Sequence, residues 1–290
     1  MKLSVEPGKY VLAVSGGVDS IALLDMLARM PELDLVVAHF DHGIRPESAD
    51  DAAFVQELTE LHNLPFATER VELGKNASEA VAREARYDFL RRIQRAVEAK
   101  AIITAHHQDD LLETAIINMI RGTGRKGITA LQDREDIRRP FLGVPKTDIV
   151  AYATQQNLSW REDTTNYDER YTRNYIRHRL LVRLNPGARQ QLLATITEMQ
   201  QLNAQIDELI TAQLTEYDQA EGLDRRWFSA LPHDVSREVM ATWLRMHDIA
   251  DFDRKTIERL TVQAKIMHPG KRLDVMHGRA IEVGREYLAL

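Results

Sequence analysis

The chain has 290 residues, of which 44% are apolar and 28% are charged, and its formal net charge is −6. This composition excludes collagen-like, mucin-like and wholly disordered chains, and the length predicts two compact units rather than one. The lack of cysteine excludes disulfides, thiolate metal sites and cysteine nucleophiles. No segment resembles a signal peptide or a membrane span, so we expect a cytoplasmic protein.

The first half of the chain alternates between predicted strands and predicted helices. Apolar patterns predict strands at residues 10–14, 35–40, 65–73 and 101–105, and helices at residues 21–27, 48–62, 78–100 and 109–120. Strands and helices that alternate in this way need crossover connections. The sequence therefore predicts an α/β fold with a mostly parallel sheet, and ligand sites at the carboxyl ends of its strands.

Helical periodicity dominates from residue 147 onward, and Asn185-Pro186-Gly187 interrupts it. We therefore predict one domain at residues 1–185 and a smaller, mainly helical domain at residues 186–290. Short alternating segments around His277-Gly278 predict a hairpin near the end of the second domain.

A glycine-rich loop lies between the first predicted strand and the first predicted helix, and it reads Ser15-Gly16-Gly17-Val18-Asp19-Ser20. Glycines allow close backbone approach and a helix amino terminus favours an anion, so the loop suits a phosphate. It lacks the Gly-Lys-Ser/Thr ending of a Walker loop and the spacing of a dinucleotide fingerprint. It resembles the SGGxDS loop of the ATP-pyrophosphatase superfamily, whose members cleave ATP between the α and β phosphates. The alternative is a glycine turn in which Asp19 and Ser20 only cap the helix.

A second polar cluster follows the strand predicted at residues 101–105 and enters a helix; it comprises Thr104, His106, His107, Asp109, Asp110, Glu113 and Thr114. Asp110 and Glu113 are three residues apart and share one helical face. Paired carboxylates can hold a lysine ammonium or a magnesium ion, and one of them can accept a proton from an attacking amine. The alternative is that Asp109 caps the helix and Glu113 is a solvated acid.

A histidine-rich segment offers a different enzyme class. His39, Asp41 and His42 follow a predicted strand, and together with His106 they could indicate a zinc or di-metal hydrolase. We keep this as the second enzyme hypothesis. It is disfavoured because the glycine-rich loop supplies an ATP function that a metallohydrolase does not require.

The segment from residue 170 to residue 197 has six arginines and no acidic residue. These are Arg170, Arg173, Arg177, Arg179, Arg183 and Arg189, and Tyr171 and Tyr175 lie among them. Arginine forks grip phosphates and tyrosines stack on unpaired bases, so this segment suits RNA. A helical surface with ion pairs to distant acids is the competing interpretation.

Together these motifs resemble bacterial tRNA(Ile)-lysidine synthetases. SGGxDS lies at residues 15–20, DHGxR at 41–45, RxxRYxF at 83–89, HHxDDxxET at 106–114 and RGxG at 121–124. A later segment also matches in order, with Trp160, Asp163-Thr164-Thr165-Asn166, Asp168, Tyr171, Arg173-Asn174 and Ile176-Arg177. The resemblance covers about the first 187 residues, and the departures at Ala130 and Leu181 lie outside the proposed chemistry.

The resemblance implies a carbon-nitrogen ligase that uses ATP, Mg²⁺, L-lysine and tRNA(Ile) with a CAU anticodon. The C2 carbonyl oxygen of the wobble cytidine attacks the α-phosphorus of ATP and releases pyrophosphate. The lysine ε-amine then attacks C2 and expels AMP, and the lysidine formed changes codon reading from AUG to AUA. Residues 1–185 would be the PP-loop catalytic domain and residues 186–290 the tRNA-binding domain.

On this basis we assign roles to individual residues. The ATP-binding residues are Ser15, Gly16, Gly17, Val18, Asp19 and Ser20, and Asp19 also meets the magnesium ion. The catalytic residues are Asp110 and Glu113 on the lysine ammonium, with Asp110 the first candidate proton acceptor, His106 near the reacting phosphate, and Arg86 at the adenylated base. The tRNA-binding residues are Arg121, Arg173 and Arg177.

Two further classes stay open. Another superfamily member, such as a tRNA thiolase or an amide-forming synthetase, would share the loop, although the lack of cysteine weakens the thiolase. A non-catalytic RNA-binding module would also keep the nucleotide fold, although the intact acidic cluster weakens that reading. The oligomeric state is open, and a homodimer is one candidate.

Overall fold

A computed structural model of the chain describes residues 3–43, 48–72, 74, 79–161, 172–249, 252–276 and 278–290. The chain divides into two compact units, Met1–Thr197 and Glu198–Leu290, and the division falls inside helix α8 (Pro186–Tyr217). The sequence predicted a catalytic domain at residues 1–185 and a tRNA-binding domain at residues 186–290. This division assigns functions to the domains, and it stays a prediction. None of the helices in the described ranges is long and apolar enough to cross a membrane.

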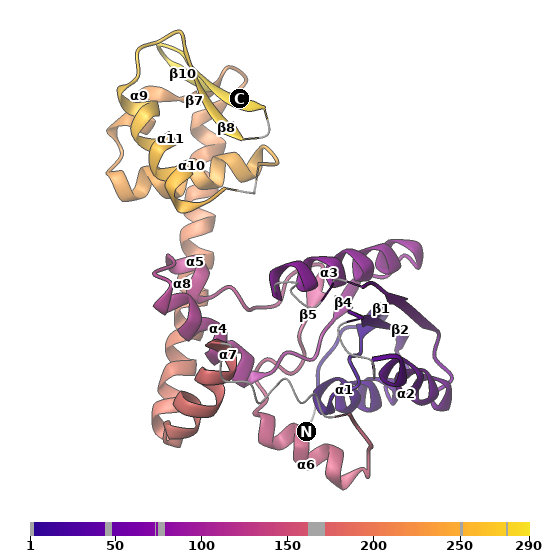
Figure 1. The fold of residues 1–290 in the computed structure, drawn as a ribbon. Helices are drawn as coiled ribbons and strands as arrows, with labels where there is room; N and C mark the ends of the chain where they lie inside the picture. Colours follow the sequence, from indigo (N-terminus) through magenta and orange to yellow (C-terminus); the bar gives the residue numbers. More distant parts are fainter. Residues whose placement is uncertain are drawn as a thin grey trace. The chain divides into compact units, whose positions relative to one another are not determined.

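Unit 1 is built on a parallel sheet with helices on both faces (Figure 1). Its strands are β1 (Gly8–Ala13), β2 (Leu33–Asp41), β3 (Phe66–Arg70), β4 (Ala101–Ile103) and β5 (Ile137–Arg138). The strand order is β3-β2-β1-β4-β5, and every neighbouring pair is parallel. The predicted α/β fold with a parallel sheet is therefore confirmed.

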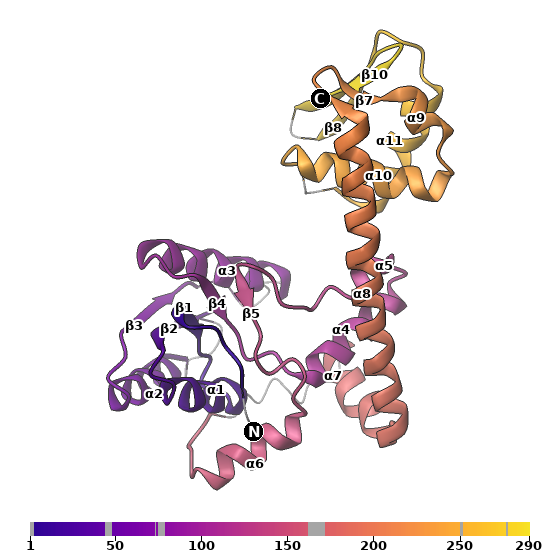
Figure 2. The same cartoon turned by 180° about the vertical axis from the view of Figure 1, so that it is seen from behind.

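The helices of unit 1 are α1 (Val18–Ala28), α2 (Ser48–Leu61), α3 (Glu79–Ala96), α4 (Gln108–Ile120), α5 (Arg125–Ile128), α6 (Lys146–Gln155) and α7 (Thr172–Tyr175). A π-helical turn, η2 (Ile176–Leu180), and a 3-10 turn, η3 (Leu181–Arg183), lead from α7 to α8. Helices α1 and α2 lie on one face of the sheet and α3 lies on the other, as Figures 1 and 2 both show.

The central strands are buried on both faces, which explains their unbroken apolar sequences. On one face, Leu12 and Leu35 belong to an apolar cluster with Leu24 of α1. On the other face, Val11 belongs to a separate cluster with Phe89 of α3. Strand β5 was not predicted, because it has only two residues and lies among charged side chains.

The order of the strands decides where the loops meet. From β1 the chain adds β2 and β3 on one side, and it then returns to place β4 on the other side of β1. In doubly wound sheets the crevice at such a reversal, at the carboxyl ends of the strands, is where ligands bind. The glycine-rich loop after β1 and the acidic cluster after β4 both start at this point.

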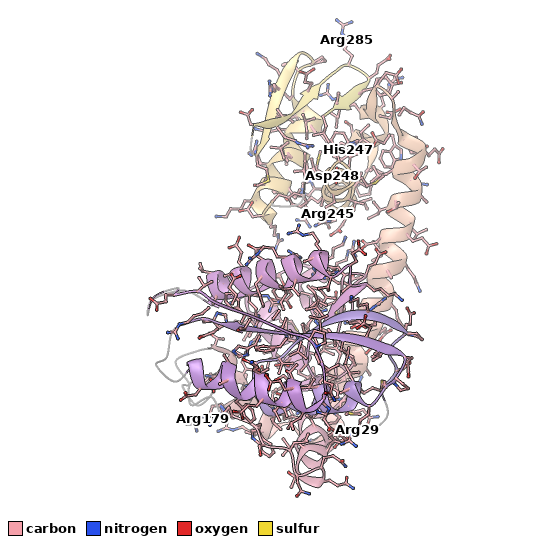
Figure 3. The ribbon with its side chains drawn as sticks, turned by 90° about the vertical axis from the view of Figure 1, so that its right-hand side faces the viewer. Arg29, Arg179, Arg245, His247, Asp248 and Arg285 are labelled. Atoms are coloured by element: carbon pink, nitrogen blue, oxygen red, sulfur yellow. The ribbon has the colours of Figure 1, made fainter. Side chains whose placement is uncertain are left out.

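Helix α6 packs against α1 and is linked to it by a buried carboxylate. Asp25 of α1 accepts hydrogen bonds from Arg29 Nε (3.0 Å) and Nη2 (2.8 Å) and from the Tyr152 hydroxyl of α6 (2.6 Å). Burial alone would raise the pKa of Asp25, but Arg29 and Tyr152 hold it below its usual range. The Arg29 side chain, labelled in Figure 3, is 59% exposed, whereas the Asp25 side chain is 5% exposed.

Unit 2 combines helices with an antiparallel sheet (Figure 2). After α8 its helices are α9 (Arg225–Ala230), α10 (His233–Met246) and α11 (Arg254–Ile266). Its strands are β6 (Asp218–Gln219), β7 (Gly222–Asp224), β8 (Lys271–Met276), β9 (Arg279–Val283) and β10 (Tyr287–Ala289), in the order β6-β7-β10-β9-β8. The helical character was predicted; of the sheet, only a hairpin, corresponding to β8 and β9, was predicted from the sequence.

Three features hold the sheet of unit 2 in place. Its core includes Phe228, Trp243 and Leu260, which are fully buried or nearly so. Gly222 has a φ of +117°, and a Cβ at this position would lie 2.2 Å from the Leu288 carbonyl oxygen, so only glycine fits between β7 and β10. At the carboxyl end of α10, His247 Nε2 lies 3.0 Å from an Asp218 carboxylate oxygen (Figure 3).

Arg225, the first residue of α9, ties the end of α11 to the sheet. Its guanidinium donates from Nε to the Ala264 carbonyl oxygen (3.1 Å), from Nη1 to the Gly284 carbonyl oxygen (2.8 Å), and also to the Met267 carbonyl oxygen. The last carbonyls of a helix have no partner within the helix. One side chain therefore satisfies them and fixes α11 beside the turn before β10.

We expect Tyr152→Phe to lower the stability of unit 1 by about 1.5 kcal/mol at neutral pH, because Asp25 loses a hydrogen bond to its charged form. A carboxyl group whose pKa is lowered in the folded state stabilises that state when the pH is above its unfolded pKa of about 4. This stabilisation is lost as the pH falls through the folded-state pKa. Hydrogen exchange of the α1 and α6 amides should therefore show a defect at about pH 7 that shrinks towards about pH 3.5. Tyr10→Phe is the control, since the Tyr10 hydroxyl donates to an uncharged carbonyl; an equal pH dependence in both variants would contradict the assignment.

We expect Arg225→Met to destabilise unit 2 by about 2 kcal/mol, because three carbonyl oxygens lose their donor. Hydrogen exchange of the amides in α11 and β9 measures the effect locally, which suits a chain with two units. The matched control is the exposed neighbour, Arg226→Met, which should stay within about 0.5 kcal/mol of the wild type. Similar exchange in the two variants would show that Arg225 does not hold α11.

Candidate active site

The glycine-rich loop joins the carboxyl end of β1 to the amino end of α1. Gly16 has a φ of +90°, a conformation that residues with side chains avoid. The Ser20 hydroxyl donates to the Gly17 carbonyl oxygen (2.9 Å) and accepts from the Ser15 amide (3.2 Å), which closes the loop on the first turn of α1. Gly17 is the helix cap and makes no side-chain cap bond, so no side chain of its own competes with an anion for the first amides. This geometry suits the phosphate binding predicted for residues 15–20.

The second polar cluster begins where β4 ends. His107 caps α4, since its Nδ1 accepts a hydrogen bond from the Asp109 amide at 3.2 Å. Asp110 Oδ2 in turn accepts from the His107 amide at 3.0 Å, which completes a reciprocal cap. The cap is therefore His107 rather than Asp109, and the carboxylate of Asp110 is held at the amino end of the helix.

Arg177 covers both acids of the predicted pair. Its Nε lies 2.7 Å from Glu113 Oε1, and its Nη2 lies 2.9 Å from Glu113 Oε2 and 3.4 Å from Asp110 Oδ1. Glu113 is 0% exposed, and a two-point guanidinium pair compensates for the burial of its charge. Arg177 belongs to the π-helical turn η2, and Ile176 and Leu181 fix this segment by packing in an apolar cluster with α4.

Asp19 links the glycine-rich loop to this cluster. Its two carboxylate oxygens each lie 2.6 Å from Lys146 Nζ. The Nε2 atom of His107 lies 3.7 Å from Asp19 Oδ2 and 3.6 Å from Asp110 Oδ2. A continuous set of polar groups therefore runs from Lys146 through Asp19, His107 and Asp110 to Arg177.

Burial and neighbouring charges shift the pKa values of Asp110 and Glu113 in opposite directions. Burial would raise the pKa of Asp110, but His107, whose backbone amide donates to this carboxylate, and Arg177 hold it below its usual range. Burial raises the pKa of Glu113, and Arg177 offsets only part of that rise. Burial also lowers the pKa of His106 to about 3, so its imidazole is neutral at neutral pH. An ionised Asp110 beside a neutral His106 suits the binding of an ammonium ion.

The other predicted site residues lie at different distances from the acids. Arg86 of α3 is near His106, because its charge contributes to the lowered pKa of that histidine. Arg173 of α7 lies near Glu113, since its positive charge lowers the pKa of Glu113 and so offsets part of the rise that burial causes. Arg121 is the C-cap of α4, and a helix rises about 1.5 Å per residue, so Arg121 lies about 16 Å along the helix from the acidic end.

Two residues of the metallohydrolase hypothesis, His39 and Asp41, have hydrogen-bond partners within the fold, whereas the buried Nδ1 of His42 has none. His39 Nδ1 lies 2.9 Å from the Val14 carbonyl oxygen, and Asp41 Oδ1 accepts from the Gly43 amide at 2.8 Å. Within the described ranges, no group of three or more His, Asp or Glu side chains is arranged to hold a metal ion. Several motif residues lie outside the described residues, namely Arg45, Asp163, Thr164, Thr165, Asn166, Asp168, Arg170 and Tyr171.

Sequence reasoning missed one cation, Lys146, and the acidic partner of another, Arg189. Arg189 of α8 pairs with Asp109. Lys146 is the first residue of α6, directly after the cap Pro145. A positive charge at a helix amino terminus opposes the helix dipole, and this mismatch is a signal that could have found Lys146. The basic segment named Arg189, but no local signal marked its partner Asp109, because the two residues lie in different helices.

Comparison with known proteins identifies the fold family. A family model described as a PP-loop domain matches residues 2–184. The chain belongs to the PP-loop domain family. The matched PP-loop domain includes the glycine-rich loop, the acidic cluster, Lys146 and Arg177.

The curated relatives confirm the resemblance read from the motifs. The tRNA(Ile)-lysidine synthase of Thermotoga sp. (strain RQ2) is 43% identical over 197 residues, which cover 63% of this chain and 47% of that protein. The tRNA(Ile)-lysidine synthase of Thermosipho africanus is 31% identical over 272 residues, which cover 88% of this chain and 62% of that protein. The chain spans about half the length of the first of these relatives.

A solved structure shares the fold of the PP-loop domain. A U34-tRNA thiolase from Methanococcus maripaludis aligns with a TM-score of 0.53 and 20% identity, over 66% of this chain and 71% of that one. At this identity the likeness shows a common fold and leaves the chemistry open.

The PP-loop domain offers a carboxylate that fits a magnesium ion accompanying ATP. In nucleotide sites Mg²⁺ is usually bound by one or two carboxylates, with substrate phosphates and water completing the octahedron. Asp19 lies directly after the glycine-rich loop, and its side chain is 26% exposed, with both oxygens already facing a cation, the Lys146 ammonium. A lone carboxylate with phosphate oxygens suits magnesium, which takes oxygen ligands, better than zinc, whose sites usually include histidine nitrogen or cysteine sulfur.

We expect Arg177→Met to destabilise unit 1 by about 3 kcal/mol, because Glu113 would stay buried without its partner. The pKa of Glu113 is already raised above 4.5, so the folded unit binds this proton more tightly than the unfolded chain does. Such a group stabilises the fold below its unfolded pKa, and the effect is lost as pH rises through its folded pKa. The defect should therefore grow from about pH 4 to about pH 7 in hydrogen exchange of the α4 amides.

The double variant Glu113→Leu/Arg177→Met separates the charge effect from lost packing. It removes both charges, so it should be more stable than Arg177→Met alone and should show no such pH dependence. Equal defects in the single and double variants would mean that the ion pair does not stabilise the site.

Proposed function

We propose that this chain forms lysidine on tRNA(Ile) with a CAU anticodon, using ATP and L-lysine. The observation that carries the proposal is the position of the acid pair Asp110 and Glu113, one strand away from the PP-loop at the same edge of the sheet. The similarity to proteins named tRNA(Ile)-lysidine synthase supports the choice of substrates.

In the first step, the C2 carbonyl oxygen of the wobble cytidine attacks the α-phosphorus of ATP, and pyrophosphate leaves. The amides and hydroxyls of residues 15–20 would bind the phosphates at the amino end of α1, and Asp19 would hold the magnesium ion that neutralises their charge. Neutral His106 would lie near the reacting phosphate, and Arg86 would stabilise charge at the adenylated base. Activation is needed because AMP leaves far more readily than a carbonyl oxygen.

In the second step, the lysine ε-amine attacks C2 and AMP leaves. The ionised Asp110 and its partner Glu113 would hold the lysine ammonium. Arg177 reduces the net negative charge around this position, which makes it easier for the bound amine to lose its proton before attack. Asp110 is the first candidate to accept that proton.

We assign the tRNA contacts to basic residues of unit 1 and to residues 186–290. Arg121 at the end of α4 and Arg173 on α7 are our candidates for the anticodon region, and residues 186–290 would add backbone contacts. Arg177, grouped with them from the sequence, would have to leave Glu113 to reach RNA. A cytoplasmic location and a homodimer stay predictions.

The test is incorporation of labelled lysine into a tRNA(Ile) transcript with a CAU anticodon, with and without ATP. We expect ATP-dependent labelling by the wild type and a loss of at least about 100-fold in Asp110→Ala, since the variant lacks both ammonium ligand and proton acceptor. The matched control is Asp88→Ala on the exposed surface of α3, which should label normally.

Other outcomes would identify the alternatives. Pyrophosphate release that depends on a sulfur donor rather than lysine would overturn the substrate and favour a thiolase. Binding of tRNA without any pyrophosphate release would favour a non-catalytic RNA-binding module.

A further inference from the structure

Lys146 is a charged residue beside the PP-loop that the proposed chemistry does not yet use. Its ammonium lies 2.6 Å from both oxygens of Asp19, the carboxylate proposed to bind magnesium. A cation placed evenly on two carboxylate oxygens takes up both of them as acceptors. Lys146 and a magnesium ion are therefore competing partners for Asp19.

The packing of α6 fixes the backbone of Lys146 beside the loop. The apolar side chains of Ile149 and Ala153 belong to the same core cluster as α1. A hydrogen bond from the Gln108 amide to the Val144 carbonyl oxygen (3.1 Å) ties the start of α6 to the start of α4. Helices α1 and α6 are linked twice, by Asp19 with Lys146 and by Asp25 with Tyr152. The second contact follows the first by the same number of residues on both helices, so α1 and α6 run parallel.

This parallel arrangement concentrates positive potential at one place. The amino ends of α1 and α6 lie together, each with the partial positive charge of a helix terminus. Lys146 adds a full positive charge where the dipole of its own helix disfavours one. In the free protein Asp19 compensates for it. Once the charge of Asp19 is engaged by a metal ion, an anion at the loop is the partner that restores the balance.

We propose that Lys146 changes partners when nucleotide binds: it pairs with Asp19 in the free protein, and it binds the pyrophosphate portion of ATP when Asp19 binds Mg²⁺. The side chain is 36% exposed and flexible enough to turn from one partner to the other without movement of α6. The proposal rests on the proposed use of ATP at the PP-loop and is independent of the lysidine chemistry.

The experiment measures binding of ATP, inorganic pyrophosphate and AMP to the full chain by titration calorimetry, each with Mg²⁺. We expect Lys146→Met to weaken ATP and pyrophosphate binding on the order of 10- to 100-fold, because one charge-assisted contact is lost. AMP lacks the pyrophosphate, so its affinity should change by less than about twofold. Lys146→Arg should recover most of the affinity for pyrophosphate, since it keeps the charge.

A second readout follows the free protein. Mn²⁺, used as a spectroscopic substitute for Mg²⁺, should bind more tightly to Lys146→Met than to the wild type without nucleotide, because Asp19 is released. The matched control is Lys9→Met, which removes a lysine paired with Asp34 on the surface and should change neither measurement.

Two results would overturn the proposal. Unchanged affinity of Lys146→Met for pyrophosphate would show that the lysine never reaches the phosphates. An equal loss of affinity for AMP would show that Lys146 acts only by positioning Asp19. Neither lysine nor tRNA enters these measurements, so a failed lysine-incorporation assay with the expected pyrophosphate result would reject the proposed function alone.

Discussion

The reversal of strand order between β1 and β4 is the constraint on which the candidate site depends. Because β1 and β4 are parallel neighbours, the loops that leave their carboxyl ends start side by side. The first loop begins α1 with uncapped amides, and the second begins α4 with His107 as its cap. The glycine-rich loop and the acidic cluster thus meet at one edge of the sheet, where the proposed reaction between a nucleotide and an amine would need them.

The second constraint is that the charged groups of the site, which are largely removed from water, must pair with groups of opposite charge. Asp19, Asp110 and Glu113 bring three carboxylates to this edge, and Lys146 and Arg177 bring two cations that pair with them. Glu113 could not stay ionised at 0% exposure without a guanidinium on both oxygens. Asp110 shares that guanidinium only weakly, at 3.4 Å, so it keeps acceptor capacity for a ligand. The two acids therefore differ: Glu113 anchors Arg177 with both oxygens, and Asp110 has the greater capacity to accept from a ligand.

The segment that closes the PP-loop domain completes this balance. Residues 172–183 pack on α4 through Ile176 and Leu181, and the π-helical turn between them presents Arg177 to the acids. Arg189 at the start of α8 pairs with Asp109 on the same helix. Residues late in unit 1 thus neutralise acids supplied near its middle, so the paired state of the acidic cluster depends on both parts of unit 1 being folded.

The sequence by itself determined the features that depend on near neighbours along the chain. Period and spacing predicted the parallel α/β fold, the loop at residues 15–20 between a strand and a helix, and one helical face for Asp110 and Glu113. Only the tertiary structure decided which charges pair. Lys146 lies 127 positions from Asp19, and Arg177 lies 64 positions from Glu113, so no local pattern connects them. The two-residue strand β5 and the short strands β6, β7 and β10 were also not predicted from the sequence. Segments this short carry no periodic pattern of their own, and their neighbours in the sheet hold them in the strand conformation.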